Sequence, residues 1–218
     1  MATFCVMAVL TSLVTLCYGD KNFTVTYEAT LEVEVKNYNG LGDDISGKVV
    51  IGMFGDTTPI TALNFKTLCE GWTRNNQKLS FKNSFCHRMV KDMLVQCGDI
   101  TTGDGTGSIS IYGQRFNDEN YSISHRSGGI VSMANHGKDT NGSQFFITIG
   151  PSRFLDKKHV AFGKVLKGFN ILRTINRMGP GADFQTPRRP IRIAECTTQE
   201  VKKYELSAND MKKDDLEA

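Results

Sequence analysis

The stretch from residue 130 to residue 165 reads IVSMANHGKDTNGSQFFITIGPSRFLDKKHVAFGKV. It holds three short, mainly apolar runs, at 130–134, 144–149 and 160–165, and segments rich in Gly, Asn, Asp and Ser separate them. Apolar runs of this length between turn-forming residues are typical of β-strands. The stretch therefore predicts a β-rich fold.

Similar strand patterns occur in the chain before and after this stretch. Further strands are predicted at residues 23–27, 31–36, 48–54 and 89–95, and around Ile191 and Ile193. Only two helices are predicted, and they lie far apart in the chain. Many short strands with two separate helices favour an antiparallel barrel or sandwich over a parallel sheet.

Each predicted helix has its own start and stop signals. The stretch Asp56-Thr57-Thr58 offers N-cap candidates, Pro59 suits the first turn and Gly71 ends the first helix. Apolar residues predict its buried face, and similar residues recur in a second helix at 169–178 that Gly179 can terminate. These apolar residues are Ile60, Leu63 and Leu68 in the first helix, and Phe169, Leu172 and Ile175 in the second.

The N-terminus predicts a secretory signal peptide at residues 1–19. No charged residue occurs from Phe4 to Tyr18, and this mostly apolar run is shorter than the roughly 20 residues that a membrane-spanning helix needs. Small residues at Cys17 and Gly19 suit the positions before a cleavage site. Because no basic residue lies near Met1, an uncleaved anchor stays the alternative. We expect no membrane association after cleavage.

Secretion would give meaning to the cysteines and to the Asn-X-Ser/Thr sequons. Cleavage after Gly19 would leave an even number of cysteines, which in an oxidising compartment favours pairing. They are Cys69, Cys86, Cys97 and Cys196. Of the three sequons, which begin at Asn22, Asn120 and Asn141, the first is the best candidate for a sugar.

Composition and spacing exclude several classes of function. The net charge is +3 and the basic residues are scattered, so we expect no nucleic-acid partner. The four histidines lack the spacing of a metal site, and we expect no metal and no cofactor. The glycine-rich segment 103–107 lacks the ending of a phosphate-binding loop and is interpreted as a turn.

The apolar residues that lie near Arg88 in the sequence remain, together with their polar neighbours. Composition alone would interpret them as ordinary core and surface residues. Ordered motifs from Phe85 to Val165 change this interpretation because together they resemble the cyclophilins. The motifs are CHRMV at 86–90, QCGD at 96–99, GDGTG at 103–107, IYG at 111–113, FNDEN at 116–120, SMAN at 132–135, NGSQFF at 141–146 and LDKKHVAFGKV at 155–165. The similarity extends from Tyr27 to Cys196. The predicted signal peptide, Lys138-Asp139 and Val165-Leu166 make the secretory, cyclophilin B-like branch the nearest match.

The resemblance implies a fold and an activity. The expected fold is a mainly β, closed eight-stranded antiparallel barrel capped by two α-helices, spanning residues 20–198, with a charged and loosely ordered tail at 199–218. The expected activity is peptidyl-prolyl cis/trans isomerisation of proline-containing polypeptides in the secretory pathway, in the endoplasmic reticulum lumen or outside the cell. We expect a monomer.

The resemblance also assigns the site residues. Arg88 matches the catalytic arginine, Gln96 its polar partner, and Asn135 the residue whose backbone holds the substrate. Met93, Leu94, Phe146 and Leu155 match the proline pocket with His159 at its rim, and Gly105, Ala134, His136 and Gln144 match neighbouring groove positions.

Several positions depart from the usual family pattern. Met93, Leu94, His136 and Phe154 all replace the common residue, which keeps open a proline-peptide binding module or chaperone with weak catalysis as the alternative function. The family binds the drug cyclosporin through an indole N–H at the position of Phe154, so we expect weakened cyclosporin binding here. The loop at residues 72–80 is also longer than in the shortest family members.

Two disulfides are predicted. If residues 89–95 fold back as a hairpin centred near Lys91 and Asp92, then Cys86 and Cys97 come about opposite each other on adjacent strands. The second pair, Cys69–Cys196, is implied by the resemblance to plant cyclophilins with an enlarged loop.

Overall fold

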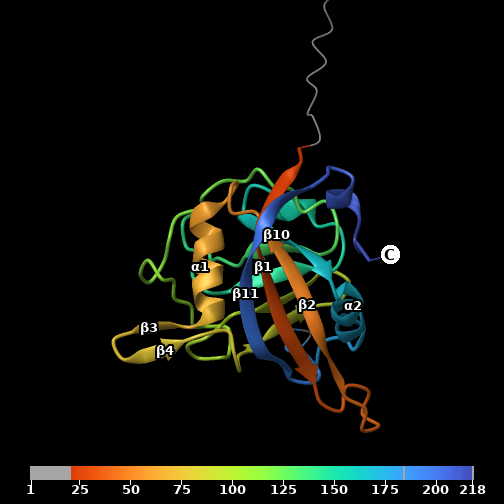
Figure 1. Cartoon of the computed structure of the whole chain (residues 1–218). Helices are drawn as coiled ribbons and strands as arrows, with labels where there is room; N and C mark the ends of the chain where they lie inside the picture. Colours follow the sequence, from red (N-terminus) through yellow and green to blue (C-terminus); the bar gives the residue numbers. More distant parts are fainter. Residues whose placement is uncertain (1–20, 184, 218) are drawn as a thin grey trace, which may run out of the picture.

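A computed structural model describes residues 21–183 and 185–217 of the chain. The predicted signal peptide lies outside the described residues. Within them, two α-helices flank a β-structure (Figure 1), which confirms a mainly β fold with two helices. The strands are β1 (Phe23–Val35), β2 (Ile45–Met53), β3 (Trp72–Arg74), β4 (Gln77–Leu79), β5 (Phe85–Cys86), β6 (Arg88–Val90), β7 (Leu94–Cys97), β8 (Ile130–Met133), β9 (Phe145–Thr148), β10 (Ala161–Lys167) and β11 (Ile191–Leu206). The helices are α1 (Pro59–Glu70) and α2 (Phe169–Arg177), with short 3₁₀ turns η1 (Arg153–Leu155) and η2 (Asp210–Lys212).

One large antiparallel sheet contains most of the strands. Among the described residues it has nine strands, in the order β5-β11-β1-β2-β10-β8-β9-β7-β6. The strands expected separately at 23–27 and 31–36 are one long strand, β1, with register shifts against β11 after Val25 and Glu32. The sheet order has two ends, at β5 and β6, so the expected closed eight-stranded barrel is not confirmed.

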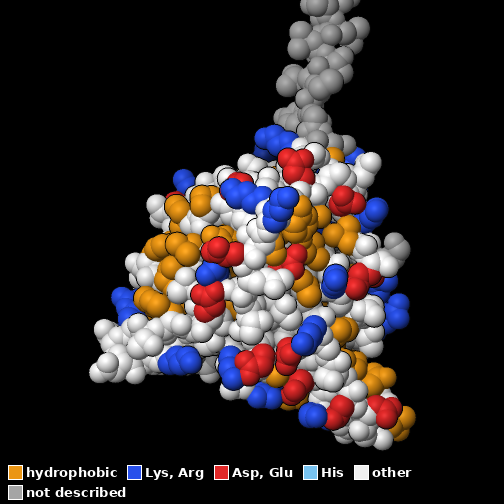
Figure 2. Space-filling model, in the orientation of Figure 1, with side chains coloured by type: hydrophobic (Ala, Val, Ile, Leu, Met, Phe, Trp, Pro, Cys, Tyr) orange, Lys and Arg blue, Asp and Glu red, His pale blue; other side chains and the backbone are white. Residues whose placement is uncertain are grey.

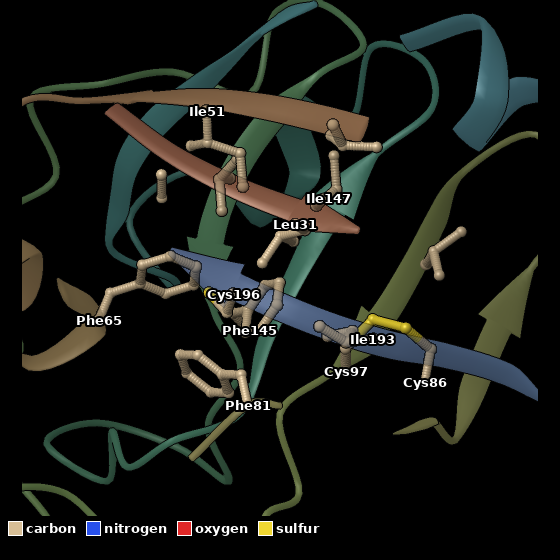
Figure 3. Packing of buried hydrophobic residues seen from close by; sticks show 14 of the residues in the cluster. Leu31, Ile51, Phe65, Phe81, Cys86, Cys97, Phe145, Ile147, Ile193 and Cys196 are labelled. Carbon is tan, nitrogen blue, oxygen red and sulfur yellow. A yellow bond between two sulfur atoms is a disulfide. The ribbon is translucent and has the colours of Figure 1, made fainter. Parts of the chain in front are cut away.

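The core lies on the inner face of this sheet. Phe65 of α1 packs against Phe81, Phe145 and Phe162, with ring centroids about 5 Å apart. Figure 3 shows Phe65, Phe81 and Phe145 near Leu31, Ile51 and Ile147 from the strands. Aromatic packing of this kind buries large apolar areas and fixes α1 against the sheet.

Helix α1 begins and ends where the sequence predicts, but its buried face differs. Ile60 and Leu63 are 49% and 47% exposed, whereas Phe65 is 1% exposed. The carboxylate of Glu119 accepts hydrogen bonds from the backbone N–H groups of Ile60 and Thr61 at the helix start. The prediction that Ile60 and Leu63 face the core is wrong, because the helix is rotated to bury the phenylalanine. Hydrophobic side chains are visible over α1 in Figure 2.

The long loop at 72–80 forms a hairpin of its own. Strands β3 and β4 pair, and the two residues between them, Asn75 and Asn76, have φ values of 47° and 62°. Two positive φ angles are typical of a type I′ turn, which asparagine tolerates well. The hairpin projects from the body of the molecule below α1 (Figure 1).

The expectation of a loosely ordered tail is wrong for the described residues. Strand β11 runs to Leu206 in pairing with β1, and Met211 is buried. The buried Lys164 ammonium donates a hydrogen bond of 2.6 Å to the carbonyl of Lys213, and burial lowers the pKa of Lys164 to about 8. Backbone pairing and this lysine order the segment despite its few apolar residues.

Both predicted disulfides are present. Cys69 is bonded to Cys196 and Cys86 to Cys97, with Cα–Cα separations of 5.0 and 3.9 Å. The first connects α1 to β11, and the second connects β5 to β7 beside the core (Figure 3). No helix in the part of the chain that the structure describes is long and apolar enough to cross a membrane.

Candidate active site

In strands β6, β7 and β9, side chains point alternately toward the core and toward the opposite face of the sheet. Met89 of β6, Val95 and Cys97 of β7, and Phe145 and Ile147 of β9 belong to the large core cluster. Because successive residues of a strand point to opposite faces, their neighbours are directed away from that core. The site is built from those neighbours, which include Arg88, Leu94, Gln96 and Phe146.

A chain of hydrogen bonds connects the polar residues of this face. Arg88 lies opposite Gln96 in the β6–β7 hairpin, and its Nη1 donates to Gln96 Oε1 at 3.3 Å. Gln96 Nε2 donates to Gln144 Oε1 at 2.8 Å. Gln144 Nε2 then donates to the carbonyls of Gly105 and Gly107. The guanidinium is therefore held through its contact with Gln96, whose side chain is in turn held by Gln144.

The loop at 99–107 is organised around a carboxylate that the sequence analysis did not assign to the site. Asp99 accepts hydrogen bonds from the backbone N–H groups of Thr102, Gly105 and Gly107. Burial alone would raise the pKa of Asp99, but hydrogen bonds, first those from Thr102, hold it well below its usual range. Asp99 thus fixes the two glycine carbonyls that hold Gln144.

Glycine is required at the tip of this loop. Gly105 has φ +94°, and a Cβ atom there would lie 2.6 Å from Cδ2 of His87. A side chain would both strain the backbone and collide with the ring. Glycine at this position therefore keeps the loop in the shape in which its carbonyls accept hydrogen bonds from Gln144.

The polar residues open into a pocket of about 570 Å³. Five predicted site residues line it: Arg88, Gln96, Gly105, Asn135 and His136. The pocket is also lined by residues that sequence reasoning missed, among them Asp183, Gln185 and Thr186 from the loop before β11. The carbonyl of Gln185 accepts a hydrogen bond from the N–H of Met89, next to Arg88.

An apolar cluster lies on the same face of the sheet. It consists of buried Leu94, Phe146 and Leu155, with Met93, Ala134 and Val90 packed against it. Five of these six residues were predicted, and Val90 was missed although its spacing from Arg88 places it on the same face. Gln96 pairs with Phe146 between β7 and β9, so the polar network and the apolar cluster adjoin.

Phe146 rests on a buried histidine that sequence reasoning also missed. The rings of His125 and Phe146 stack with centroids 5.8 Å apart. His125 Nδ1 lies 2.8 Å from Asp156 and Nε2 lies 3.0 Å from the Ser132 hydroxyl. Burial lowers the pKa of His125, although Asp156 opposes this. A neutral imidazole held at both nitrogens gives Phe146 a rigid support.

The remaining predicted residues surround the apolar cluster. The ring of His159 meets Phe146 edge-on at 5.3 Å, and its Nδ1 lies 3.0 Å from the carbonyl of Met133; burial lowers its pKa. The Asn135 side chain donates to the carbonyl of Lys158 at 2.9 Å. Phe154 is 58% exposed, next to Leu155 in η1.

Within residues 21–183 and 185–217, no group of three or more His, Cys, Asp or Glu side chains is placed to hold a metal ion. The geometry places a positioned guanidinium beside an apolar cluster on one face of the sheet.

Comparison with known proteins gives the class of this protein. The family model described as cyclophilin type peptidyl-prolyl cis-trans isomerase/CLD matches residues 35–198. Peptidyl-prolyl cis-trans isomerase 11 of Caenorhabditis elegans is 46% identical over 151 residues, which cover 69% of this chain and 82% of the relative. Peptidyl-prolyl cis-trans isomerase H of Mycosarcoma maydis is 46% identical over 152 residues, covering 69% of this chain and 97% of the relative. The protein is thus of the peptidyl-prolyl cis-trans isomerase class, and the chain belongs to the cyclophilin-type family within it.

We expect the Asp99→Asn variant to be less stable than the wild type by about 2–4 kcal/mol at pH 7, because charged acceptors contribute strongly to buried hydrogen bonds. The folded pKa of Asp99 is depressed, so its contribution is fully present above the unfolded pKa of about 4 and is lost progressively as pH falls from there through the folded pKa. Urea denaturation of both proteins at pH 7 and pH 3 measures this. A stability difference of the same size at both pH values would contradict the assignment.

Proposed function

We propose that Arg88 catalyses rotation about X–Pro peptide bonds as a hydrogen-bond donor to the amide nitrogen. Rotation costs roughly 18–20 kcal/mol because it breaks the amide resonance. In the twisted state the nitrogen lone pair is released, so a guanidinium that donates to it binds the transition state better than either ground state. The observation that carries the proposal is the Arg88–Gln96 contact beside the apolar cluster.

The apolar cluster supplies the second part of the mechanism. Phe146, Leu155 and Met93 would hold the pyrrolidine ring of the substrate and exclude water from the bond that turns. A dry site strengthens the field of the arginine, and a fixed ring determines which side of the bond rotates. Asn135, on the wall of the polar pocket, would hold the substrate backbone.

We further infer that the sheet closes into an eight-stranded barrel. Its two end strands, β5 and β6, are separated in the chain only by His87, so the same segment pairs with β11 at one end of the sheet and with β7 at the other. Counted as one strand, they reduce nine strands to eight. The Cys86–Cys97 disulfide joins β5 to β7 across this point.

We also propose that the protein acts in the secretory pathway, on the cyclophilin B-like branch of the family. Support comes from the uncharged segment at 4–18 and from the two disulfides, which form and persist in oxidising compartments. Asn22 is exposed and accessible to glycosylation, whereas the Asn141 side chain is buried.

A protease-coupled proline-peptide assay on the recombinant chain from residue 20 tests the proposed activity. We expect acceleration of cis-to-trans conversion by the wild type. Binding of proline peptides without acceleration would favour the alternative, a binding module or chaperone with weak catalysis. This alternative is kept because the residues common in the family are replaced at Met93, Leu94, His136 and Phe154.

We expect the Phe154→Trp variant to bind cyclosporin about 5- to 150-fold more tightly than the wild type, with little change in turnover. The indole N–H would supply a hydrogen bond of roughly 1–3 kcal/mol that phenylalanine cannot donate. Because the Phe154 side chain is 58% exposed, the larger ring has room. Calorimetric titration measures the gain. An unchanged affinity would place the cause in the altered pocket at Met93 and Leu94.

A further inference from the structure

Four cations gather beside the proposed catalytic pocket. Arg177 and Arg188 line two adjoining hollows of about 490 and 840 Å³, with Arg189 at the first and Lys91 at the second. Arg177, Arg188 and Lys91 are exposed, and Arg189 is half-buried. Among the described residues, no Asp or Glu lines either hollow. We call these four residues the basic cluster.

The charge of the basic cluster is not neutralised by neighbouring carboxylates. The ion pairs found among the described residues involve other cations. Asp43 and Asp44, on the loop beside the first hollow, are hydrogen-bonded to Asn39 and Lys36. Asp183 accepts hydrogen bonds from the hydroxyl and the backbone N–H of Thr186 and faces the catalytic pocket instead.

The basic cluster is continuous with the catalytic pocket through one loop. Pro180 and Pro187 form a β-bridge that closes the loop. Gln185 and Thr186 line the pocket that contains Arg88, whereas Pro180 and its two successors line the second basic hollow. Lys91 follows Arg88 by three residues at the start of the hairpin turn, so the two residues are at most about 10 Å apart along the chain.

We propose that the basic cluster docks acidic segments of client polypeptides whose proline occupies the catalytic pocket. This inference rests on the proposed isomerase function and names the class of substrate. An extended peptide advances about 3.3 Å per residue, so carboxylates some three to six positions from the proline would reach the cluster. Arginine recognises carboxylates with a fork of N–H donors. A polypeptide is favoured over a nucleic acid because the cluster borders the groove that binds proline.

The test compares kcat/KM for matched proline peptides with acidic, neutral and basic extensions, placed on either side of the X–Pro bond. At low ionic strength we expect a preference of about three- to tenfold for an acidic over a neutral extension. Salt at about 0.5 M and the triple variant Arg177→Gln, Arg188→Gln, Arg189→Gln should both bring the ratio close to one. A matched control, Lys21→Gln with Lys78→Gln and Lys202→Gln, removes the same charge from exposed positions elsewhere and should keep the preference.

Turnover of the neutral peptide shows that the triple variant is folded and active. If the wild type turned over the peptides without preferring an acidic extension, the docking site would be refuted and the isomerase proposal would not be affected. Binding of the acidic peptide to the Arg88→Ala variant, followed by fluorescence anisotropy, tests the cluster independently of catalysis. The wild type could turn over no peptide, while the acidic peptide still bound to Arg88→Ala and did not bind to the triple variant. In that case the isomerase proposal would fail and the docking site would be supported. Tighter binding of an oligonucleotide than of the acidic peptide, through the same arginines, would overturn the choice of partner.

Discussion

The Arg88→Ala variant is expected to lose about 100- to 1000-fold in kcat/KM for an X–Pro peptide while keeping its fold. Removing one preorganised donor to a transition state typically costs about 2.7–4 kcal/mol. Arg88 is half-buried at the wall of the pocket, and its side chain bonds to Gln96 rather than to a core residue. The expected loss is therefore one of catalysis and not of packing.

Two measurements separate this outcome from a structural effect. Thermal unfolding should change little in Arg88→Ala, and an Arg88→Lys control should recover only part of the activity because a point charge lacks the fork of donors. Parallel losses of activity and stability would make Arg88 a structural residue. Full activity in the alanine variant would refute the mechanism.

The sequence could predict those parts of the fold that depend on local pattern. The turn at Asp92, which has φ 59°, lies where the hairpin was expected. That hairpin brings Cys86 within reach of Cys97, as predicted. Helix α2 begins at Phe169 and buries the predicted Phe169, Leu172 and Ile175, since a three-residue spacing fixes one face of a helix.

Contacts between distant residues could not be predicted in this way. Glu119 contacts the start of α1 from 59 residues away in sequence, and Gln144 bonds to the carbonyl of Gly105 from 39 residues away. No local pattern indicates either contact. The segment after residue 198 looks like a solvated tail because the strand it pairs with, β1, lies at the other end of the chain. The sequence does not indicate the basic cluster either, because its residues are far apart in the chain and come together only in the folded protein. They are residues 91, 177, 188 and 189.

The double variant Cys69→Ala with Cys196→Ala is expected to lower the free energy of unfolding by about 4–5 kcal/mol. On the chain-entropy model a disulfide restricts the unfolded chain more when it closes a longer loop. This one spans 127 residues and connects the end of α1 to β11, two elements that are otherwise held together by side-chain packing and by a hydrogen bond from the Thr198 hydroxyl to Glu70. Its loss should leave peptide turnover unchanged at temperatures below the unfolding transition, because neither cysteine lines the catalytic pocket.

The second disulfide provides the matched comparison that makes this expectation specific. Cys86 and Cys97 are only 11 residues apart, so the same model gives a smaller loss of about 3 kcal/mol for their double alanine variant. That pair, however, flanks Arg88 and Gln96, and its removal should reduce kcat/KM as well as stability, since it frees the strand ends that carry the catalytic contact. Urea denaturation and peptide turnover, measured on both double variants, separate the two effects. We expect the first disulfide to stabilise the fold and the second to support the active site. A stability loss below about 1 kcal/mol in Cys69→Ala with Cys196→Ala would contradict this division of roles. An equal loss of turnover in both double variants would contradict it as well.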